Sequence, residues 1–448
     1  MPRRIILVAS LILLALTGCS LLSPQQGPVI PTPPPVVSSG AVNFSDLQLI
    51  TNPVSMIAPA VDPEIEALIN AVSEQQLIAY VQTLEAFGTR NTFSETQRDD
   101  YGIGAARRWI HDEFLRVNGG ALQVEYEDFI ANIDGRQTNQ RNVIATLPGI
   151  SNHPGATVLI AHYDSRHIDP NDGGSRAPGA DDNASGVALL LELARLMSSR
   201  SWNQTIIFAA FAAEEQGTYG SRYFVQDKML EGRVFDAAIV NDIVGGRPGI
   251  PQSIRLFSPG PDTNNSRQLA RYVDLIGGMY VPEFRVDIIE ALDREGRYSD
   301  HREFINAGVP GIRLTESEED RDHQHSGADT SDQIDYNYLR QVAQLNLAVA
   351  ANMAGAPPTP PDPTVAPMAD PGAYIINWAP DPLASGYAIS FRILGSEEHP
   401  PFRFVSAAES GNVAITGLDP QVIYALSLAA IDGRGRLSMF SPELIVGG

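Results

Sequence analysis

A short apolar run ends in two ionisable residues in the stretch VLIAHYD, residues 158–164. Four consecutive apolar residues are typical of a strand that is buried on both faces of its sheet. The stretch TIIFA, residues 205–209, has the same character. Because segments with helical periodicity separate such strands, we predict an α/β fold with a mainly parallel central sheet flanked by helices.

The apolar spacing gives the expected order of elements around these two strands. Helices are predicted over residues 65–87, 95–117, 186–197, 266–276 and 336–353. Strands are predicted over residues 142–147, 157–164, 204–213, 235–244 and 254–257. Beyond residue 371 the pattern changes to short alternating strands with no helix, which predicts a C-terminal all-β immunoglobulin-like sandwich.

Two proline-rich stretches divide the chain. Residues 23–40 contain six prolines among small and polar residues, a composition that cannot bury a core, and residues 357–371 are similar. We therefore expect a tether over residues 19–44, an α/β domain over 45–356, a linker over 357–371 and the sandwich over 372–448.

The first eighteen residues have the features of a secretory signal peptide. Arg3 and Arg4 precede an apolar run of about a dozen residues, too short to span a bilayer as a helix. The following Leu16-Thr17-Gly18-Cys19 resembles the bacterial lipobox, in which the cysteine becomes lipidated after cleavage. This pattern predicts a protein of the bacterial cell envelope, outside the cytoplasm and anchored to the membrane at Cys19. The alternative is a plain signal peptide with an incidental cysteine.

Composition restricts the chemistry. The formal net charge of −22 argues against a nucleic-acid partner, which needs a basic surface. Cys19 is the only cysteine, so a bound metal must be held by His, Asp and Glu. Five of the eight histidines lie between His162 and His325, which indicates where a metal would bind.

Ionisable residues follow the ends of the predicted strands, where sites form in open α/β sheets. One by one they have structural explanations; Asp181 and Asp182, for example, could cap a helix at a tight turn. As a set they are typical of a two-metal centre, which needs about this number of ligands. The candidate ligands are His162, Asp182, Glu215, Asp242 and His325. Asp164 could accept a hydrogen bond from His162 and fix its ring.

The ordered motifs resemble those of the co-catalytic dizinc aminopeptidase family. The family includes secreted bacterial leucyl aminopeptidases, glutamate carboxypeptidase and the catalytically inactive transferrin receptor. The resemblance covers about residues 65–353. It rests on the His-x-Asp of His162 and Asp164, Asp-Asn-Ala-Ser-Gly at 182–186, the pair Glu214-Glu215, Asp242, Ser-Asp-His at 299–301, and His325 with Asp329-Thr330.

The resemblance implies two zinc ions (Zn²⁺) and a role for each residue. His162 and Asp242 would hold one ion, Glu215 and His325 the other, and Asp182 would bridge both through an unusual cis peptide to Asn183. Glu214 would be the general base, and Asp164 would orient His162. One departure is Gln324, which stands where family members often have Tyr. His323 is therefore an alternative to His325.

The function implied is that of a zinc-dependent aminopeptidase, in which a metal-activated water attacks the peptide and Glu214 moves the proton. A carboxypeptidase on the same metal site, a glutaminyl cyclase with one zinc and a catalytically inactive binding protein are the alternatives. Arg285, Tyr298 and Arg313 are possible lining residues. In the C-terminal region, Trp378, Tyr387 and Tyr424 resemble the core residues of a fibronectin type III domain. The pattern gives no oligomeric state.

Overall fold

The computed structural model describes residues 48–50, 58–117, 119–397, 402–409 and 413–448. The predicted signal peptide, Cys19 and the tether lie outside these residues. No helix within the described ranges is long and apolar enough to cross a membrane.

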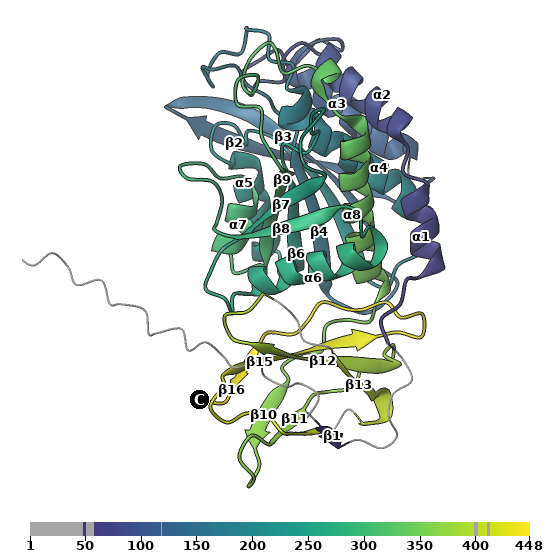
Figure 1. Ribbon diagram of the computed structural model, residues 1–448. Helices are drawn as coiled ribbons and strands as arrows, with labels where there is room; N and C mark the ends of the chain where they lie inside the picture. The colour runs from purple at the N-terminus through teal and green to yellow at the C-terminus, as the bar shows by residue number, and fades with distance from the viewer. Residues whose placement is uncertain (1–47, 51–57, 118, 398–401, 410–412) are drawn as a thin grey trace, which may run out of the picture. The chain divides into compact units, whose positions relative to one another are not determined.

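An eight-stranded sheet forms the centre of the α/β region, with the order β2-β3-β5-β4-β6-β9-β7-β8 (Figure 1). Its strands are β2 (Gln123–Ile133), β3 (Arg136–Leu147), β4 (Gly155–His162), β5 (Thr205–Phe211), β6 (Val234–Asn241), β7 (Ser253–Ser258), β8 (Arg285–Glu290) and β9 (Gly311–Glu316). The central strands β5, β4, β6 and β9 are parallel. This centre places four strand ends along one edge of the sheet.

The sheet as a whole is mixed: four of its seven strand pairs are parallel, in line with the prediction, and three are antiparallel. The pairs β2–β3, β3–β5 and β7–β9 are antiparallel. The physical cause is clearest for β2 and β3, which are joined by Asp134 and Gly135 alone. Both residues have positive φ, 50° and 83°, as a tight hairpin turn requires. A two-residue turn permits only antiparallel pairing.

Helices cover both faces of the sheet, as expected for strands that are apolar on both sides. They are α1 (Pro63–Asn70), α2 (Glu74–Ala86), α3 (Gly102–Val117), α4 (Gly186–Met197), α5 (Tyr219–Leu230), α6 (Asn265–Tyr280), α7 (His301–Asn306) and α8 (Tyr336–Gly355). Leu159 and Ala161 of β4 share a buried core with α4 and α8. Val158 and Ile160 belong to a second buried core, with residues of α5 and α7. Alternation along one strand thus supplies both cores.

The helix α3 begins at Gly102, seven residues later than the predicted start. The preceding segment folds back over the first turn: Glu95 O accepts from Gly104 N at 3.1 Å, and Ser94 Oγ accepts from Ile103 N at 2.9 Å. Gly102 has φ +82°, and a Cβ there would lie 2.4 Å from Glu95 O. The loop therefore satisfies the free N–H groups of the helix start instead of extending the helix.

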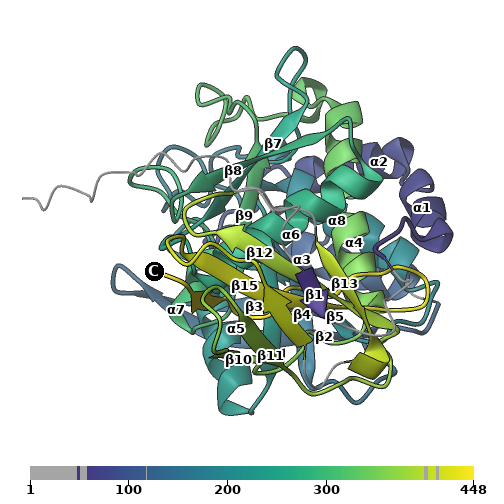
Figure 2. The same ribbon diagram turned by 60° about the horizontal axis from the view of Figure 1, so that its bottom comes forward.

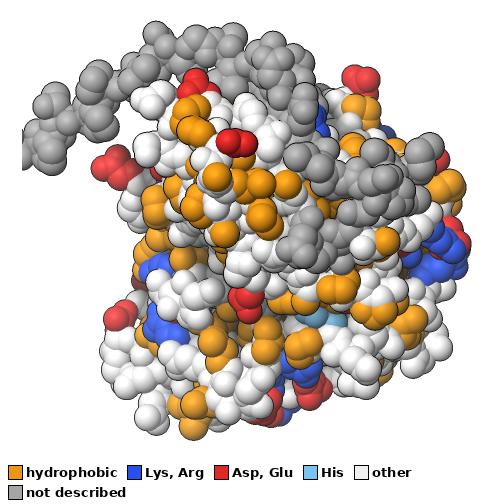
Figure 3. Space-filling model, turned by 90° about the horizontal axis from the view of Figure 1, so that it is seen from below, with side chains coloured by type: hydrophobic (Ala, Val, Ile, Leu, Met, Phe, Trp, Pro, Cys, Tyr) orange, Lys and Arg blue, Asp and Glu red, His pale blue; other side chains and the backbone are white. Residues whose placement is uncertain are grey.

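Strands of the C-terminal region form two four-stranded antiparallel sheets, β1-β14-β11-β10 and β13-β12-β15-β16, and the first of these also takes β1 from the N-terminal side of the α/β region (Figure 2). Their strands are β1 (Gln48–Ile50), β10 (Thr364–Pro367), β11 (Tyr374–Asn377), β12 (Gly386–Ile393), β13 (Arg403–Ser406), β14 (Val413–Thr416), β15 (Tyr424–Ile431) and β16 (Leu444–Val446). The rings of Trp378 and Tyr387 are 5.1 Å apart, and Asp419 N donates to Tyr424 Oη at 3.3 Å. On the face in Figure 3, hydrophobic side chains lie among both acidic and basic ones.

Candidate metal centre

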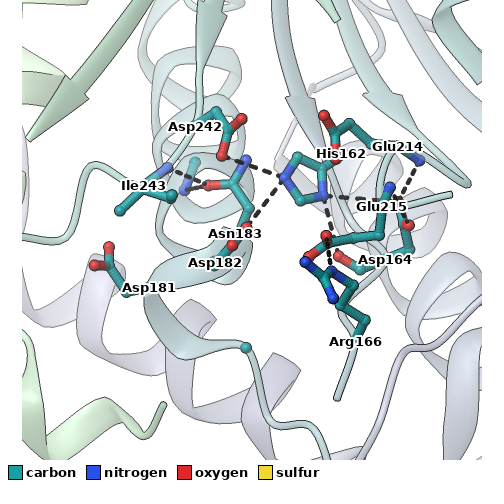
Figure 4. Close-up of polar contacts among 12 residues, drawn as sticks. His162, Asp164, Arg166, Asp181, Asp182, Asn183, Glu214, Glu215, Asp242 and Ile243 are labelled. Atoms are coloured by element: carbon teal, nitrogen blue, oxygen red, sulfur yellow. Dashed lines mark hydrogen bonds and ion pairs between the residues drawn. The ribbon is translucent and has the colours of Figure 1, made fainter. Parts of the chain in front are cut away.

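The candidate ligands gather where the parallel strands end (Figure 4). His162 is the last residue of β4, and Asp242 directly follows β6. Glu214 and Glu215 lie in the loop after β5, and Asp182 precedes α4. Since parallel strands end at the same edge, residues up to 163 positions apart in sequence (162 and 325) meet at one place.

A first cluster is formed by His162, Asp182 and Asp242. His162 Nε2 lies 3.3 Å from Asp182 Oδ1 and 3.3 Å from Asp242 Oδ1. All three side chains are buried. Their ligand atoms lie within 4.8 Å of one another, a spacing that can hold a metal ion.

A second cluster uses the other oxygen of Asp182. His325 Nε2 lies 3.0 Å from Asp182 Oδ2 and 3.5 Å from Glu215 Oε2, and these ligand atoms are also within 4.8 Å of one another. One carboxylate thus faces both clusters, with one oxygen turned to each. A carboxylate placed in this way could bridge two cations if each cluster held one.

His323 does not belong to either cluster. Its side chain is 43% exposed, and Nδ1 lies 3.0 Å from Asp320 Oδ2. The structure therefore brings His325, and not the alternative His323, to the other four residues.

The turn that carries Asp182 is held from several sides. Asp329 accepts hydrogen bonds from Asp181 N at 2.8 Å and from Asp182 N at 3.1 Å. Asn183 Nδ2 donates to Asn241 O at 2.9 Å, which ties the turn to the end of β6. The peptide between Asp182 and Asn183 is cis, as predicted.

Asp164 has a wider role in the geometry than the predicted contact with His162. The nearer acceptor for His162 Nδ1 is the main-chain oxygen of Asp164, at 3.1 Å, whereas Oδ1 lies at 3.7 Å. The carboxylate itself accepts from Glu214 N and Glu215 N, each at 3.1 Å. Asp164 therefore fixes the loop after β5 relative to the end of β4.

Burial and charge make this site strongly acidic. Burial raises the pKa of Glu214 well above its usual range, and burial together with Asp182 raises the pKa of Glu215 to about 7. Burial also acts on Asp182, but His162 and His325 outweigh it and hold its pKa well below the usual range. Closely spaced buried carboxylates with two imidazoles are stabilised by cations.

Two observations test whether the residues fit a metal. Among the described residues, Glu215 Oε1 is a buried atom without a hydrogen-bond partner, and His325 Nε2 faces the carboxylate oxygens of Asp182 and Glu215. Both belong to the second cluster and are available as ligand atoms. Imidazole nitrogen and carboxylate oxygen without cysteine are a donor set that zinc accepts, so the residues present fit the ion that the sequence predicts.

Two arginines that contact the ligands were not assigned this role from the sequence. Arg166 Nε lies 2.8 Å from Glu215 Oε2, and the buried Arg313 Nη2 lies 3.1 Å from Asp242 Oδ2. Despite the burial of Asp242, Arg313 helps to hold the pKa of its carboxyl well below the usual range. No sequence pattern gives these pairs, although Arg166 follows Asp164 by two positions.

The clusters open into a cavity of about 350 Å³. Its walls include Glu214, Asp242, Arg166, Arg297 and the predicted Tyr298. Arg285 and Arg313, which were also predicted as possible lining residues, are not among the residues that line this cavity. Arg285 is exposed and paired with Asp287 at 2.7 Å, and Arg313 is fully buried behind Asp242.

The site lies within a region that matches a known family. The model described as "Peptidase family M28" matches residues 142–350, which include all five candidate ligands. A probable zinc metalloprotease of the fungus Leptosphaeria maculans is 34% identical over 350 residues, covering 70% of this chain and 81% of the relative. The chain belongs to peptidase family M28.

Solved structures share the fold of this M28 chain. The aminopeptidase LapA of Legionella pneumophila has a TM-score of 0.55 at 20% identity, covering 67% of this chain and 77% of LapA. A glutaminyl cyclase of Porphyromonas gingivalis has a TM-score of 0.50 at 24% identity, covering 62% of this chain and 97% of the cyclase. At these identities the likeness extends to the fold alone.

Proposed function

We propose that this M28 peptidase is a dizinc exopeptidase and that it acts as an aminopeptidase, removing N-terminal residues from peptides. The observation that carries the proposal is the placement of Asp182, whose two carboxylate oxygens face His162 and His325 separately. A single-metal site would need only one of these two clusters. Membership of the family already makes the chain a zinc-dependent peptidase.

Each ligand has a place in this proposal. His162 and Asp242 would hold one zinc ion, Glu215 and His325 the other, and Asp182 would bridge them. When bound, the two ions supply Lewis acidity, polarising the scissile carbonyl and lowering the pKa of the attacking water.

Glu214 is the proposed general base. It lines the cavity beside both clusters but belongs to neither. The backbone N–H of Glu214 is fixed by Asp164 at 3.1 Å. Burial raises the pKa of its carboxyl, which makes the carboxylate a stronger base toward the attacking water, and the proton it takes then goes to the leaving amine. Proton transfer of this kind contributes about 10²–10⁴-fold to a rate.

The acidic wall of the cavity supports an aminopeptidase over a carboxypeptidase. Glu214, Glu215, Asp182 and Asp242 all line it. Three of these carboxylates would be ligands whose charge the two zinc ions offset, so Glu214 is the carboxylate left to attract a substrate ammonium and to repel a substrate carboxylate. A glutaminyl cyclase shares the fold, and the intact second cluster of Asp182, Glu215 and His325 favours the two-metal peptidase over a one-zinc cyclase.

Aminoacyl-anilides test the proposal directly. We expect the purified full chain to release N-terminal residues from free anilides, to spare N-acetylated ones, and to lose this activity with a chelator. A preference for N-blocked peptides with a free C-terminus would favour the carboxypeptidase. A zinc-loaded preparation that cleaves neither would refute the peptidase and favour a binding protein.

The remaining sequence predictions stay proposals. Residues 1–18 would be a lipoprotein signal peptide, and lipidated Cys19 would anchor the enzyme outside the cytoplasm by the tether 19–44. The peptidase domain would span residues 45–356, followed by the linker 357–371. A fibronectin type III-like sandwich would span residues 372–448, and the Trp378–Tyr387 contact and the Tyr424 hydrogen bond support it. One of its two sheets also includes β1 and β10, which lie outside these predicted bounds. Metabolic labelling with a fatty acid, lost in a Cys19→Ala variant, tests the anchor.

A further inference from the structure

The wall of the metal cavity is not acidic throughout. Three guanidinium groups, those of Arg166, Arg294 and Arg297, line the same cavity as the carboxylates. Buried or half-buried arginines are normally paired with a carboxylate. Which of the three is free to bind a ligand follows from their partners.

Two of the three are neutralised by the protein. Arg166 Nε contacts Glu215 Oε2 at 2.8 Å. Arg294 forms ion pairs with Glu319 and with Asp293, the latter at 3.2 Å. Neither has its charge available for a substrate without giving up a protein partner.

Arg297 is different. Its Nη1 donates to the amide oxygen of Gln324 at 3.3 Å, and no carboxylate of the described residues lies within 4.0 Å of its guanidinium. Gln324 directly precedes His325, so this arginine is connected to the metal side of the cavity. A neutral amide positions the guanidinium without cancelling its charge.

The loop that presents Arg297 is anchored on both sides. Before it, Asp293 pairs with buried Arg313 at 2.7 Å. After it, the guanidinium of Arg302 lies 3.5 Å from the centre of the Tyr298 ring. Arg297 N also donates to Arg294 O at 3.1 Å. These contacts on both sides of the loop fix the position of Arg297.

We propose that Arg297 forms a carboxylate-binding subsite, so that the enzyme prefers short peptides carrying a carboxylate on the leaving side of the scissile bond. This deepens the proposed aminopeptidase function and rests on it. Glu214, which is not a proposed zinc ligand, attracts the substrate ammonium, and the guanidinium of Arg297, held by a neutral amide, attracts a substrate carboxylate. A cavity of about 350 Å³ is at the small end of ligand pockets and suits a short zwitterionic peptide.

Two sources of this carboxylate are distinguishable. It is either the C-terminus of a dipeptide or the acidic side chain of the residue after the scissile bond. We would measure kcat/KM for alanyl-alanine against alanyl-alaninamide, and for dipeptide amides with aspartate against asparagine in second position. In the wild type, one pair or both should favour the carboxylate by roughly ten- to hundred-fold.

The variant Arg297→Gln should abolish that preference, because it lowers kcat/KM for the charged member of each pair much more than for the uncharged member. Arg321→Gln is the matched control, because Arg321 is exposed and does not line the cavity. It should retain the preference. A preference that survives in Arg297→Gln, or an equal loss on charged and uncharged substrates, would overturn the proposal.

A binding measurement separates this inference from the proposed function. In the Glu214→Gln background, where substrate persists, calorimetry should show tighter binding of alanyl-alanine than of its amide, and the difference should vanish when Arg297→Gln is added. If the wild type cleaves no peptide but this difference is found, the aminopeptidase proposal fails and the subsite stands. If alanyl-alanine and its amide bind with equal affinity, the subsite proposal is wrong, whether or not the wild type cleaves peptides.

Discussion

Replacing Asp164 by Asn should weaken zinc binding even though Asp164 is not itself a ligand. Its two carboxylate oxygens accept one backbone N–H each, from Glu214 and Glu215 at 3.1 Å. Asn retains one acceptor oxygen and turns an NH₂ group toward the other N–H. One buried donor then loses its partner, which costs about 1–3 kcal/mol, and the remaining hydrogen bond loses the assistance of a charge.

We therefore expect the metal-free protein to lose about 2–4 kcal/mol of unfolding free energy. The displaced loop carries Glu215, so zinc affinity should fall by about 10–100-fold, the usual effect of removing a partner behind a metal ligand. Urea unfolding in chelator measures the first quantity. Competition with a chromogenic zinc chelator measures the second.

Asp172→Asn is the matched control for this experiment. Asp172 also accepts two backbone N–H groups, from Gly174 at 2.9 Å and Ser175 at 3.0 Å. Both bonds go to the same oxygen, which Asn retains, and the residue is only partly buried. Its zinc affinity should match the wild type. If Asp164→Asn also binds zinc with wild-type affinity, Asp164 does not position the metal centre and our reasoning is refuted.

Three further outcomes follow from the same contacts. Glu214→Gln should lower kcat by about 10²–10⁴-fold with unchanged zinc content by mass spectrometry; a parallel loss of zinc would make Glu214 a ligand. Chelation should lower the melting temperature, because the buried carboxylates of Asp182 and Asp242 lose their counter-charge; free zinc at 100 times its Kd stabilises by about 2.7 kcal/mol, and an unchanged melting temperature would contradict the site. The pKa of His153 is raised chiefly by its hydrogen bond to Asp236 at 2.7 Å, so this pair stabilises the fold below about pH 6.5 and the contribution is lost as pH rises through the raised pKa. His153→Gln should therefore cost about 1 kcal/mol at pH 5.5 and less at pH 9; equal losses at both pH values would exclude the ion pair.

The core strands and the meeting of the candidate ligands could be predicted because both follow from burial. A strand such as β4 is apolar on both faces only if helices cover both, and an ionisable residue at its end needs a partner. His162 and Asp242 carry that information in their immediate sequence. The two-cluster arrangement then follows from Asp182 lying between them and His325.

The mixed character of the sheet was missed because pairing direction depends on connections. β2 has alternating burial at Phe129, Ala131 and Ile133, a half-buried pattern that a search for continuous apolar runs passes over. The Asp134-Gly135 pair after it is a strong hairpin signal and could have placed β2 and β3 antiparallel. At the other edge, β7 and β9 pair antiparallel although α6, β8 and α7 lie between them in the sequence, so no local turn marks their direction.

Arginines show where prediction from sequence ends. A carboxylate beside an apolar strand indicates a cation nearby, but an arginine has a long side chain, and its role depends on which carboxylates the fold brings within its reach. Ion pairs within the protein join Arg166 to Glu215, Arg294 to Glu319 and Arg313 to Asp242. Only after these pairs are assigned does Arg297 stand out as a lining guanidinium held by a neutral amide. Gln324 supplies that amide, at the position where the family that the sequence resembles often has Tyr. The same residue that made the choice of His325 uncertain in the sequence therefore leaves the positive charge of Arg297 unneutralised in the cavity wall.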